Sequence, residues 1–524
     1  MAVSAKTMTE GAAPISHSTL PRRAVAAPPT PGALKLGPDR IGSLIFLFGL
    51  LLTGLYLPSL ATTPEKVARF GAIGVLVSMS VSIFLDALRG FQNLIRADVM
   101  ALISLYYLTL VEFLFKQPIF NSMVGVPATR TAVIACLCGF AGIVAGRHCL
   151  QFREQPFKTL MRYPVPEWAL AFLFWACFLL GFFHMLLAVD FDVFKMVDCF
   201  MDPRFSQPWS RGRYGDWKAL LSEFAMLFYL LPPMAGIMFA RRHKYSMGNL
   251  TTIGAGLLFL LFYGFTSGTR SLLGAYLMGF VTGYAFAWDR KRKMELFVIA
   301  ASAVAVMFVC TTVMLEFRVI GLKKYLTSDF KMKESADDDG SFYVDYNLHT
   351  IARLAEFFPK KHTYLGFEVP YLALIRPVPR AMWPDKPKGM SVPIEDVMGA
   401  GITWTVAATF IGEGYMSGGL IAVFVSALML GMIIACWNQL AAPENSDFGI
   451  LIYASGFFAL AITMRSVFIL TTTLLPSFTA MILGSLFIRI MTPRLTRGYR
   501  AVAGRRPAGQ TTVARTGNAP RRNF

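Results

Sequence analysis

Long uninterrupted runs of apolar residues constrain the fold of this chain more than any other feature of its sequence. Of its 524 residues, 55% are hydrophobic and only 15% are charged, whereas about a quarter of the residues of an average soluble protein are charged. A helix that spans the hydrocarbon layer needs about 20 apolar residues. Backbone groups find no water partner in lipid, so these runs predict helices and an all-α polytopic membrane protein.

The runs predict about 12 transmembrane helices. In the tenth run, the residues that cross the membrane are expected in its later part. The β-barrel alternative is disfavoured because alternating strands of about 10 residues are absent. The predicted spans lie near 41–60, 68–87, 98–116, 131–146, 167–188, 219–240, 249–267, 271–288, 295–315, 404–437, 447–465 and 472–491.

The placement of Lys and Arg predicts which side of the membrane each turn faces. The net charge is +19, and basic residues cluster in alternate turns and in the C-terminal tail. Lys and Arg are retained on the cytoplasmic side, so both termini are predicted to be cytoplasmic. No aromatic-basic groove pattern accompanies the charge, which argues against nucleic acid. The basic turns are 88–97, 147–166, 241–248 and 289–294, whereas 438–446 is not basic and leaves the last two helices the least constrained.

The long segment 316–403 falls on the opposite, periplasmic face. It carries twelve basic and twelve acidic residues and so has no net charge. Loops beyond about 15 residues are usually functional or disordered. The predicted organisation is therefore a disordered cytoplasmic tail at 1–40, helices 1–9 at 41–315, the large periplasmic loop at 316–403, helices 10–12 at 404–491 and a basic cytoplasmic tail at 492–524.

The second half of this loop carries an amphipathic helical pattern. Leu348, Ile351, Leu354 and Phe358 recur at helical spacing, and Asp345 is available as an N-cap. This helix is expected to lie on the membrane surface or against the bundle.

A proline-stiffened segment follows, with Arg376, Arg380, Lys386 and Trp383. Proline reduces the entropy lost when side chains are aimed at a ligand, and arginine presents a planar fork that matches phosphate oxygens. The segment predicts an anion site at the membrane surface. The alternative is a proline-rich surface loop with ordinary solvated charges.

Glu413 and Tyr415 stand at the entrance of the tenth span between glycines. A carboxylate is costly to bury there and is often functional, although it could also be solvated at the lipid boundary. Arg270 and Arg318 each lie at a span end on the same predicted face. Either arginine could instead extend to the lipid headgroups.

No cofactor and no metal site are expected. The Asp190-Phe-Asp192 pair is similar to a metal-nucleotide motif of glycosyltransferases, but its predicted side lacks nucleotide sugars. His349 and His362 lie in the periplasmic loop, where an isolated histidine is more typical of a surface residue than of a base.

Several of these segments resemble the bacterial oligosaccharide repeat-unit polymerases, the Wzy-type O-antigen and exopolysaccharide polymerases. The similar stretch covers roughly 260–430, and its most specific element is the Pro-Arg-x-x-Trp-Pro-x-Lys-Pro run at 379–387. The segments are Tyr343-Val-Asp345-Tyr-Asn347, Phe358-Pro359, Tyr364-Leu-Gly366, Pro379-Arg380-Ala-Met-Trp383-Pro384-Asp-Lys386-Pro387 and Glu413-Gly-Tyr415 with Gly418-Gly419.

The resemblance implies transfer of a growing glycan from undecaprenyl diphosphate to a new undecaprenyl-diphosphate-linked oligosaccharide at the periplasmic face of the inner membrane. It further implies a partner that regulates chain length. In this reaction, fixed cations would stabilise the leaving diphosphate, and a carboxylate would accept the proton of the attacking hydroxyl. The expected roles are Glu413, then Asp345 and His349, for catalysis; Arg270, Arg318, Arg376, Arg380 and Lys386 for the diphosphate; and Trp383 and Tyr415 for sugar rings.

Two other functions stay open. An O-antigen ligase-like glycosyltransferase has a similar helix count and long periplasmic loop. A lipid-linked oligosaccharide flippase or polysaccharide exporter would place cations in a central cavity, whereas the candidate cations here gather at one predicted face.

Overall fold

The computed structural model describes residues 37–503, with gaps at 61–62, 153, 204–205, 210–220, 289–292, 318–319, 328–345, 379, 381, 388, 400–406 and 443. Its helices belong to one compact unit, Leu36–Phe524. The described residues form helices and no strands, so the all-α prediction is confirmed for them.

Nine helical segments of the described chain are long and apolar enough to cross a membrane. They include α1 (Arg40–Leu60), α2 (Pro64–Leu88), α5 (Val126–Cys149), α7 (Glu167–Ala188), η3 (Glu223–Leu230) with α10 (Leu231–Ala240), α11 (Met247–Thr266), α13 (Lys293–Phe317), α18 (Thr409–Asn438) and α20 (Val467–Ala503).

The other three predicted spans also overlap helices. α3 (Ala97–Thr109) and α19 (Asp447–Ile462) are apolar but have only 13 and 16 residues, and α12 (Arg270–Ala287) has 18. Every predicted span therefore overlaps a helix, while the count of twelve crossings stays a prediction. Shorter elements are η1 (Phe91–Ile95), η2 (Val111–Leu114), α4 (Phe120–Met123), α6 (Lys158–Met161), α8 (Val193–Phe200), η4 (Arg242–Lys244), α14 (Leu322–Thr327), α15 (Asn347–Phe357), α16 (Glu368–Ile375) and α17 (Ile394–Met398).

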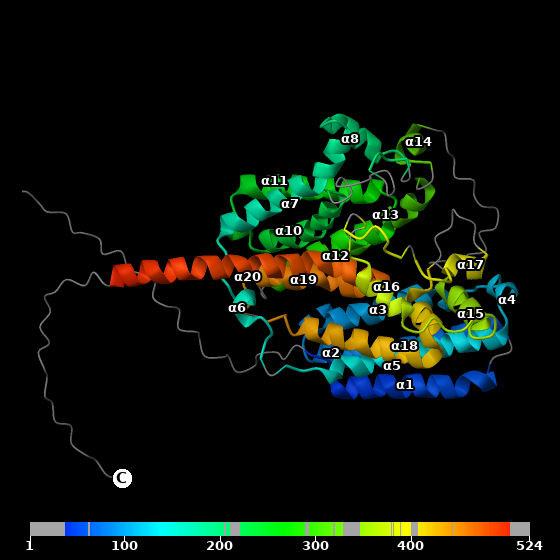
Figure 1. Ribbon diagram of the computed structural model, residues 1–524. Coiled ribbons are helices and arrows are strands. Elements are labelled where there is room, and N and C mark those ends of the chain that lie inside the picture. The colour runs from blue at the N-terminus through cyan, green and yellow to red at the C-terminus, as the bar shows by residue number, and fades with distance from the viewer. Residues whose placement is uncertain are drawn as a thin grey trace, which may run out of the picture. The chain divides into compact units, whose positions relative to one another are not determined.

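The helices pack around two hydrophobic cores. One core joins α1, α2, α3, α5 and α18, and the other joins α7, α10, α11 and α12. α19 contributes to both, with Tyr453 in the first and Leu451 in the second. Figure 1 shows α19 and α20 between these two groups of helices. Apolar residues all around α19 fit this central position.

α18 is two helical arms joined at a break. Gly418 and Gly419 have non-helical backbone angles, and Gly419 has a φ of 67°. A Cβ atom on Gly414 would lie 3.2 Å from Cα of Val423. Residues nine apart in a straight helix are about 13.5 Å apart along the axis, so the short arm, 409–417, folds back on the long arm, 420–438. The expected restriction of the span to the later part of 404–437 agrees with this break.

The amphipathic helix of the predicted loop is α15. Leu348, Ile351, Leu354 and Phe358 are fully buried, and α15 packs on α5 and α18. The predicted helix is confirmed, and it lies against the bundle. Asp345 lies outside the described residues, and the residue that precedes the helix as N-cap is Tyr346. Figure 1 shows α4, α15, α16 and α17 gathered at one end of the bundle.

Candidate functional site

Glu413 lies on the short arm of α18 and is only 4% exposed. Its two carboxylate oxygens each receive one hydrogen bond from the start of α20. Ser466 Oγ donates to Oε1 at 2.5 Å, and the backbone N–H of Val467 donates to Oε2 at 2.6 Å. The first backbone N–H groups of a helix lack partners inside it and attract negative charge. Glu413 therefore joins the short arm of α18 to the N-terminal end of α20.

The glycines around Glu413 allow close backbone contacts, as the sequence indicated. Gly419 has a positive φ, and a Cβ atom there would lie 2.9 Å from the Tyr364 hydroxyl. The backbone N–H groups of Leu365 and Gly366 donate to the carbonyl groups of Met416 and Ser417, at 2.8 and 2.9 Å. These contacts hold the 364–366 segment against the end of the short arm.

The proline-stiffened segment folds back on itself through its own cations. Lys386 Nζ donates to the carbonyl groups of Arg376 and Val378, both at 2.8 Å. Arg380 donates from Nη1 to the carbonyl of Lys386 at 2.8 Å and from Nη2 to that of Pro387 at 3.1 Å. These bonds fix the loop and leave other N–H groups of both side chains for a ligand, since Arg has five donors and Lys three.

The side chains of Arg376, Arg380 and Lys386 are close enough to affect the pKa of Lys386. Burial and the guanidinium groups of Arg380 and Arg376 lower the pKa of Lys386, while Glu223 at the start of η3 acts in the opposite direction. Like charges crowd together at an energetic cost. A dense group of cations is suited to binding an anion of high charge. We name Arg376, Arg380 and Lys386 the cation cluster.

Arg376 connects the cation cluster to Glu413. Its guanidinium carbon lies 5.9 Å from the centre of the Phe468 ring, and Phe468 directly follows the residue that donates to Glu413. Arg376 also lies within electrostatic range of the Glu413 carboxylate. The structure thus brings together a cluster of cations and a buried carboxylate that are 27 or more residues apart in the chain.

α16 holds the cation cluster in place. Thr471 Oγ1 of α20 donates to the carbonyl of Ala373 at 2.7 Å. Ser391 donates to the Glu368 carboxylate from its backbone N–H and from its hydroxyl, at 2.5 and 2.7 Å. The cation-bearing loop is therefore closed at its base, which limits the entropy that it would lose on binding.

The remaining predicted site residues lie around this group. Tyr415 is buried at 6% exposure and meets the Tyr364 ring edge to face at 6.2 Å. Trp383 is half-buried within the cation-bearing loop. Burial and Arg353 lower the pKa of His349, against the effect of Glu356, which favours the neutral form of its ring.

Three other predicted site residues lie elsewhere or outside the described part of the chain. Arg270 begins α12 and is half-buried. Arg318 and Asp345 lie outside the described residues. No group of three or more His, Cys, Asp or Glu side chains that could hold a metal ion is found in the described part of the chain.

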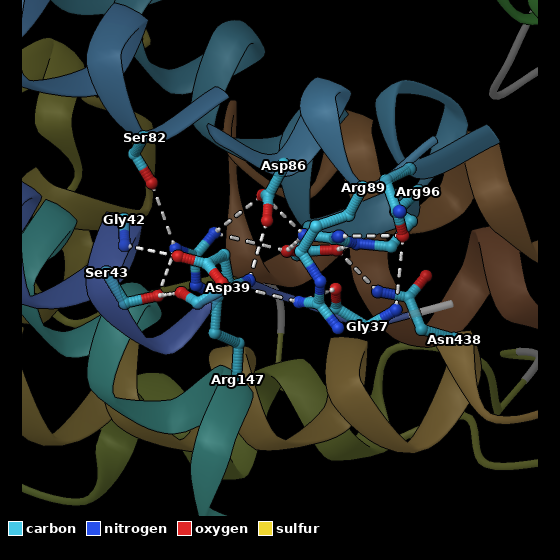
Figure 2. Close-up of polar contacts among 12 residues, drawn as sticks. Gly37, Asp39, Gly42, Ser43, Ser82, Asp86, Arg89, Arg96, Arg147 and Asn438 are labelled. Atoms are coloured by element: carbon cyan, nitrogen blue, oxygen red, sulfur yellow. Dashed lines mark hydrogen bonds and ion pairs between the residues drawn. The ribbon is translucent and has the colours of Figure 1, made fainter. Parts of the chain in front are cut away.

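A second buried polar group was missed by sequence reasoning (Figure 2). Arg96 and Arg147 meet Asp86 and Asp98, and all four are at most 3% exposed. Arg96 Nη2 lies 2.8 Å from both Asp86 Oδ2 and Asp98 Oδ2, and Arg147 Nη1 lies 3.3 Å from Asp98 Oδ2. Two positive and two negative charges cancel, as burial requires.

Neighbouring helices complete this buried network. Asn438, the last residue of α18, donates to Asp98 at 2.6 Å and accepts from the backbone N–H of Ala97 at 2.9 Å. Arg147 Nη2 donates to the hydroxyls of Ser43 and Ser82 at 2.5 and 3.2 Å. Figure 2 shows these side chains converging from α1, α2, α5 and α18. The network therefore ties together the helix ends farthest from α15.

Two cations of the predicted basic turns thus lie in the interior and not at the surface. Arg96 of the 88–97 turn and Arg147 of the 147–166 turn are neutralised inside the bundle. The available signal was the presence of Asp86 and Asp98 at the ends of apolar runs, because a carboxylate there needs a cationic partner.

Comparison with known proteins adds one partial match. A family described as "Domain of unknown function (DUF8712)" matches residues 275–492, which include the cation cluster and Glu413 but none of α1 to α11. No curated protein matches the chain. No solved structure matches it either.

Proposed function

We propose that this protein polymerises undecaprenyl-diphosphate-linked oligosaccharide repeat units at the periplasmic face of the bacterial inner membrane. The observation that supports this most is the cation cluster, whose member Arg376 acts electrostatically on the buried carboxylate of Glu413. In this proposal both termini are cytoplasmic, and the 316–403 segment is periplasmic. The resemblance to Wzy-type polymerases, across roughly 260–430, supports the same reaction.

The cation cluster suits the departure of a diphosphate. A hydroxyl of the acceptor sugar attacks the anomeric carbon of the donor glycan, and the bond from that carbon to the diphosphate oxygen breaks. The electron pair leaves with undecaprenyl diphosphate, whose growing charge Arg376, Arg380 and Lys386 stabilise. No nucleotide is needed, because the diphosphate linkage is already activated.

The proton of the attacking hydroxyl needs an acceptor. Glu413 is the candidate, since each of its oxygens keeps a lone pair beside the hydrogen bond that it accepts from Ser466 or Val467. General bases contribute about 10²- to 10⁴-fold in rate.

The test is the surface polysaccharide of a deletion strain, resolved on a gel and complemented with variants. A polymerase deletion leaves caps of a single repeat unit. Unattached long chains would instead identify a ligase, and loss of all external glycan would identify a flippase or exporter.

Arg380→Gln separates charge from loop structure in that assay. The glutamine amide keeps a donor for the carbonyl groups that Arg380 now binds, and it removes the charge. We expect single-repeat caps from this variant. The matched control is Arg353→Gln, which removes an exposed cation of α15 that pairs with Glu356, and which should restore full-length polymer. Full-length polymer from Arg380→Gln would refute the role of the cation cluster.

A further inference from the structure

A small hollow lined partly by charged side chains opens where α2 begins. It measures about 300 Å³, and half of its lining side chains are cations. One wall comes from the first turns of α2 and the other from the segment after η2. The lining residues are Thr63, Glu65, Lys66, Arg69, Lys116 and Pro118.

The one acidic lining residue, Glu65, offsets only one of the three positive charges. The Glu65 carboxylate accepts from the backbone N–H of Gln117 at 2.9 Å and from Asn121 Nδ2 at 3.1 Å. Asn121 Oδ1 in turn accepts from the Glu65 backbone N–H at 3.0 Å. Glu65 therefore holds the 117–121 segment against α2.

The three cations have no acidic partner of their own. Across the described residues, Lys66, Arg69 and Lys116 form no ion pair with a carboxylate, and all three are exposed. With three cations and one carboxylate, the lining of the hollow has a net charge of +2, which favours an anion.

An exposed apolar stripe continues from these cations along α2. Ile73, Val77 and Phe84 are 46%, 59% and 61% exposed. They lie on the same helix face as Lys66 and Arg69, because they follow at intervals close to multiples of 3.6 residues. The opposite face of α2, with Val67, Ala72 and Val75, is fully buried.

The cations of the hollow and the apolar stripe of α2 follow one another as the headgroup and the acyl chains of a lipid do. α2 is one of the helices able to cross a membrane, so its exposed apolar face meets acyl chains and its first turns lie at the headgroups. Phe115 and Ile119, beside Lys116, are also 47% and 50% exposed. The hollow lies on the predicted periplasmic face, where positive-inside placement disfavours cations. An anionic headgroup would offset that cost.

We propose that Lys66, Arg69 and Lys116 bind the phosphate headgroup of an anionic membrane phospholipid, whose acyl chains lie along Ile73, Val77 and Phe84 of α2. This lipid site is separate in sequence from the cation cluster, and it does not depend on the reaction proposed above.

The test counts phospholipids bound to the full-length protein by native mass spectrometry. The protein in detergent is titrated with phosphatidylglycerol, with phosphatidylcholine, or with phosphatidylglycerol in the presence of glycerol 3-phosphate. Wild-type protein should retain phosphatidylglycerol in preference to phosphatidylcholine. Glycerol 3-phosphate should not displace it, because the soluble headgroup lacks the acyl chains.

The diagnostic variant is the triple substitution Lys66→Gln, Arg69→Gln and Lys116→Gln. Each basic residue near an anionic lipid contributes about 1 kcal/mol, so the loss of three should weaken phosphatidylglycerol binding about a hundredfold.

The matched control removes three exposed cations of the same predicted face that do not line the hollow. It carries Lys195→Gln, Lys360→Gln and Lys361→Gln, and it should bind the lipid as wild type does. Equal weakening in both triple variants would overturn the proposal, because net charge alone would then explain it. Wild-type binding in the diagnostic variant, or displacement by glycerol 3-phosphate, would also overturn it. None of these lipid-binding measurements depends on polysaccharide synthesis. The lipid site and the proposed polymerase activity can therefore be refuted independently.

Discussion

Glu413→Gln separates the structural role of this side chain from its proposed chemistry. The glutamine oxygen can accept from the Val467 N–H, and its amide nitrogen can donate to Ser466 Oγ, whose hydroxyl is free to turn. The variant keeps the shape of the side chain and both contacts to α20. It loses the negative charge and the ability to accept a proton.

The effect on stability should be small for glutamine and large for alanine. A hydrogen bond to a charged group contributes about 1.5–3 kcal/mol and a neutral one about 1 kcal/mol. The loss in Glu413→Gln is offset because a buried carboxylate no longer has to be desolvated, at several kcal/mol. We expect its unfolding free energy to stay within about 2 kcal/mol of wild type. Glu413→Ala leaves two buried donors without an acceptor and should cost about 2–6 kcal/mol.

Two measurements on each variant decide between these roles. Thermal unfolding of the purified protein should be near wild type for Glu413→Gln and lower for Glu413→Ala. The polysaccharide gel should show single-repeat caps for both, because a missing general base costs at least about a hundredfold in rate. Wild-type polymer from Glu413→Gln would refute Glu413 as the proton acceptor. If Glu413→Gln is unfolded, hydrogen bonding alone does not account for the structural role of Glu413.

Three further outcomes follow from single sites. Asp98→Asn should lower the unfolding free energy by about 3–5 kcal/mol, since two buried guanidinium groups then share one carboxylate. The denaturation midpoint in detergent measures this loss. An unchanged midpoint would contradict the ion network. Gly419→Ala should cost about 1–2 kcal/mol, because its φ is 67° and the new Cβ would meet the Tyr364 hydroxyl; a more stable variant would contradict it. Polymer synthesis in membranes should fall as pH rises through the lowered pKa of Lys386, because the positive charge of its side chain is lost there. Lys386→Arg should move this fall to higher pH. Identical pH profiles for wild type and Lys386→Arg would exclude Lys386 as the titrating group.

Much of the architecture follows from local sequence patterns. Apolar runs of span length can form only helices in lipid, so all twelve overlap helices of the structure. The spacing of Leu348, Ile351 and Leu354 places them on one face, and that face is buried. The proximity of Arg376, Arg380 and Lys386 follows from the short chain between them.

The tertiary structure decided which distant polar groups meet. No periodicity pairs Glu413 with the start of α20, 53 residues further along, because a helix pattern reports which face is apolar and not which neighbour covers it. Arg96 and Arg147 resemble positive-inside charges in the sequence. Arg96 is buried against Asp86 of α2, and Arg147 of α5 is buried against Asp98 of α3. Charged groups enter a dry interior only with partners, and packing of the helices brings those partners together.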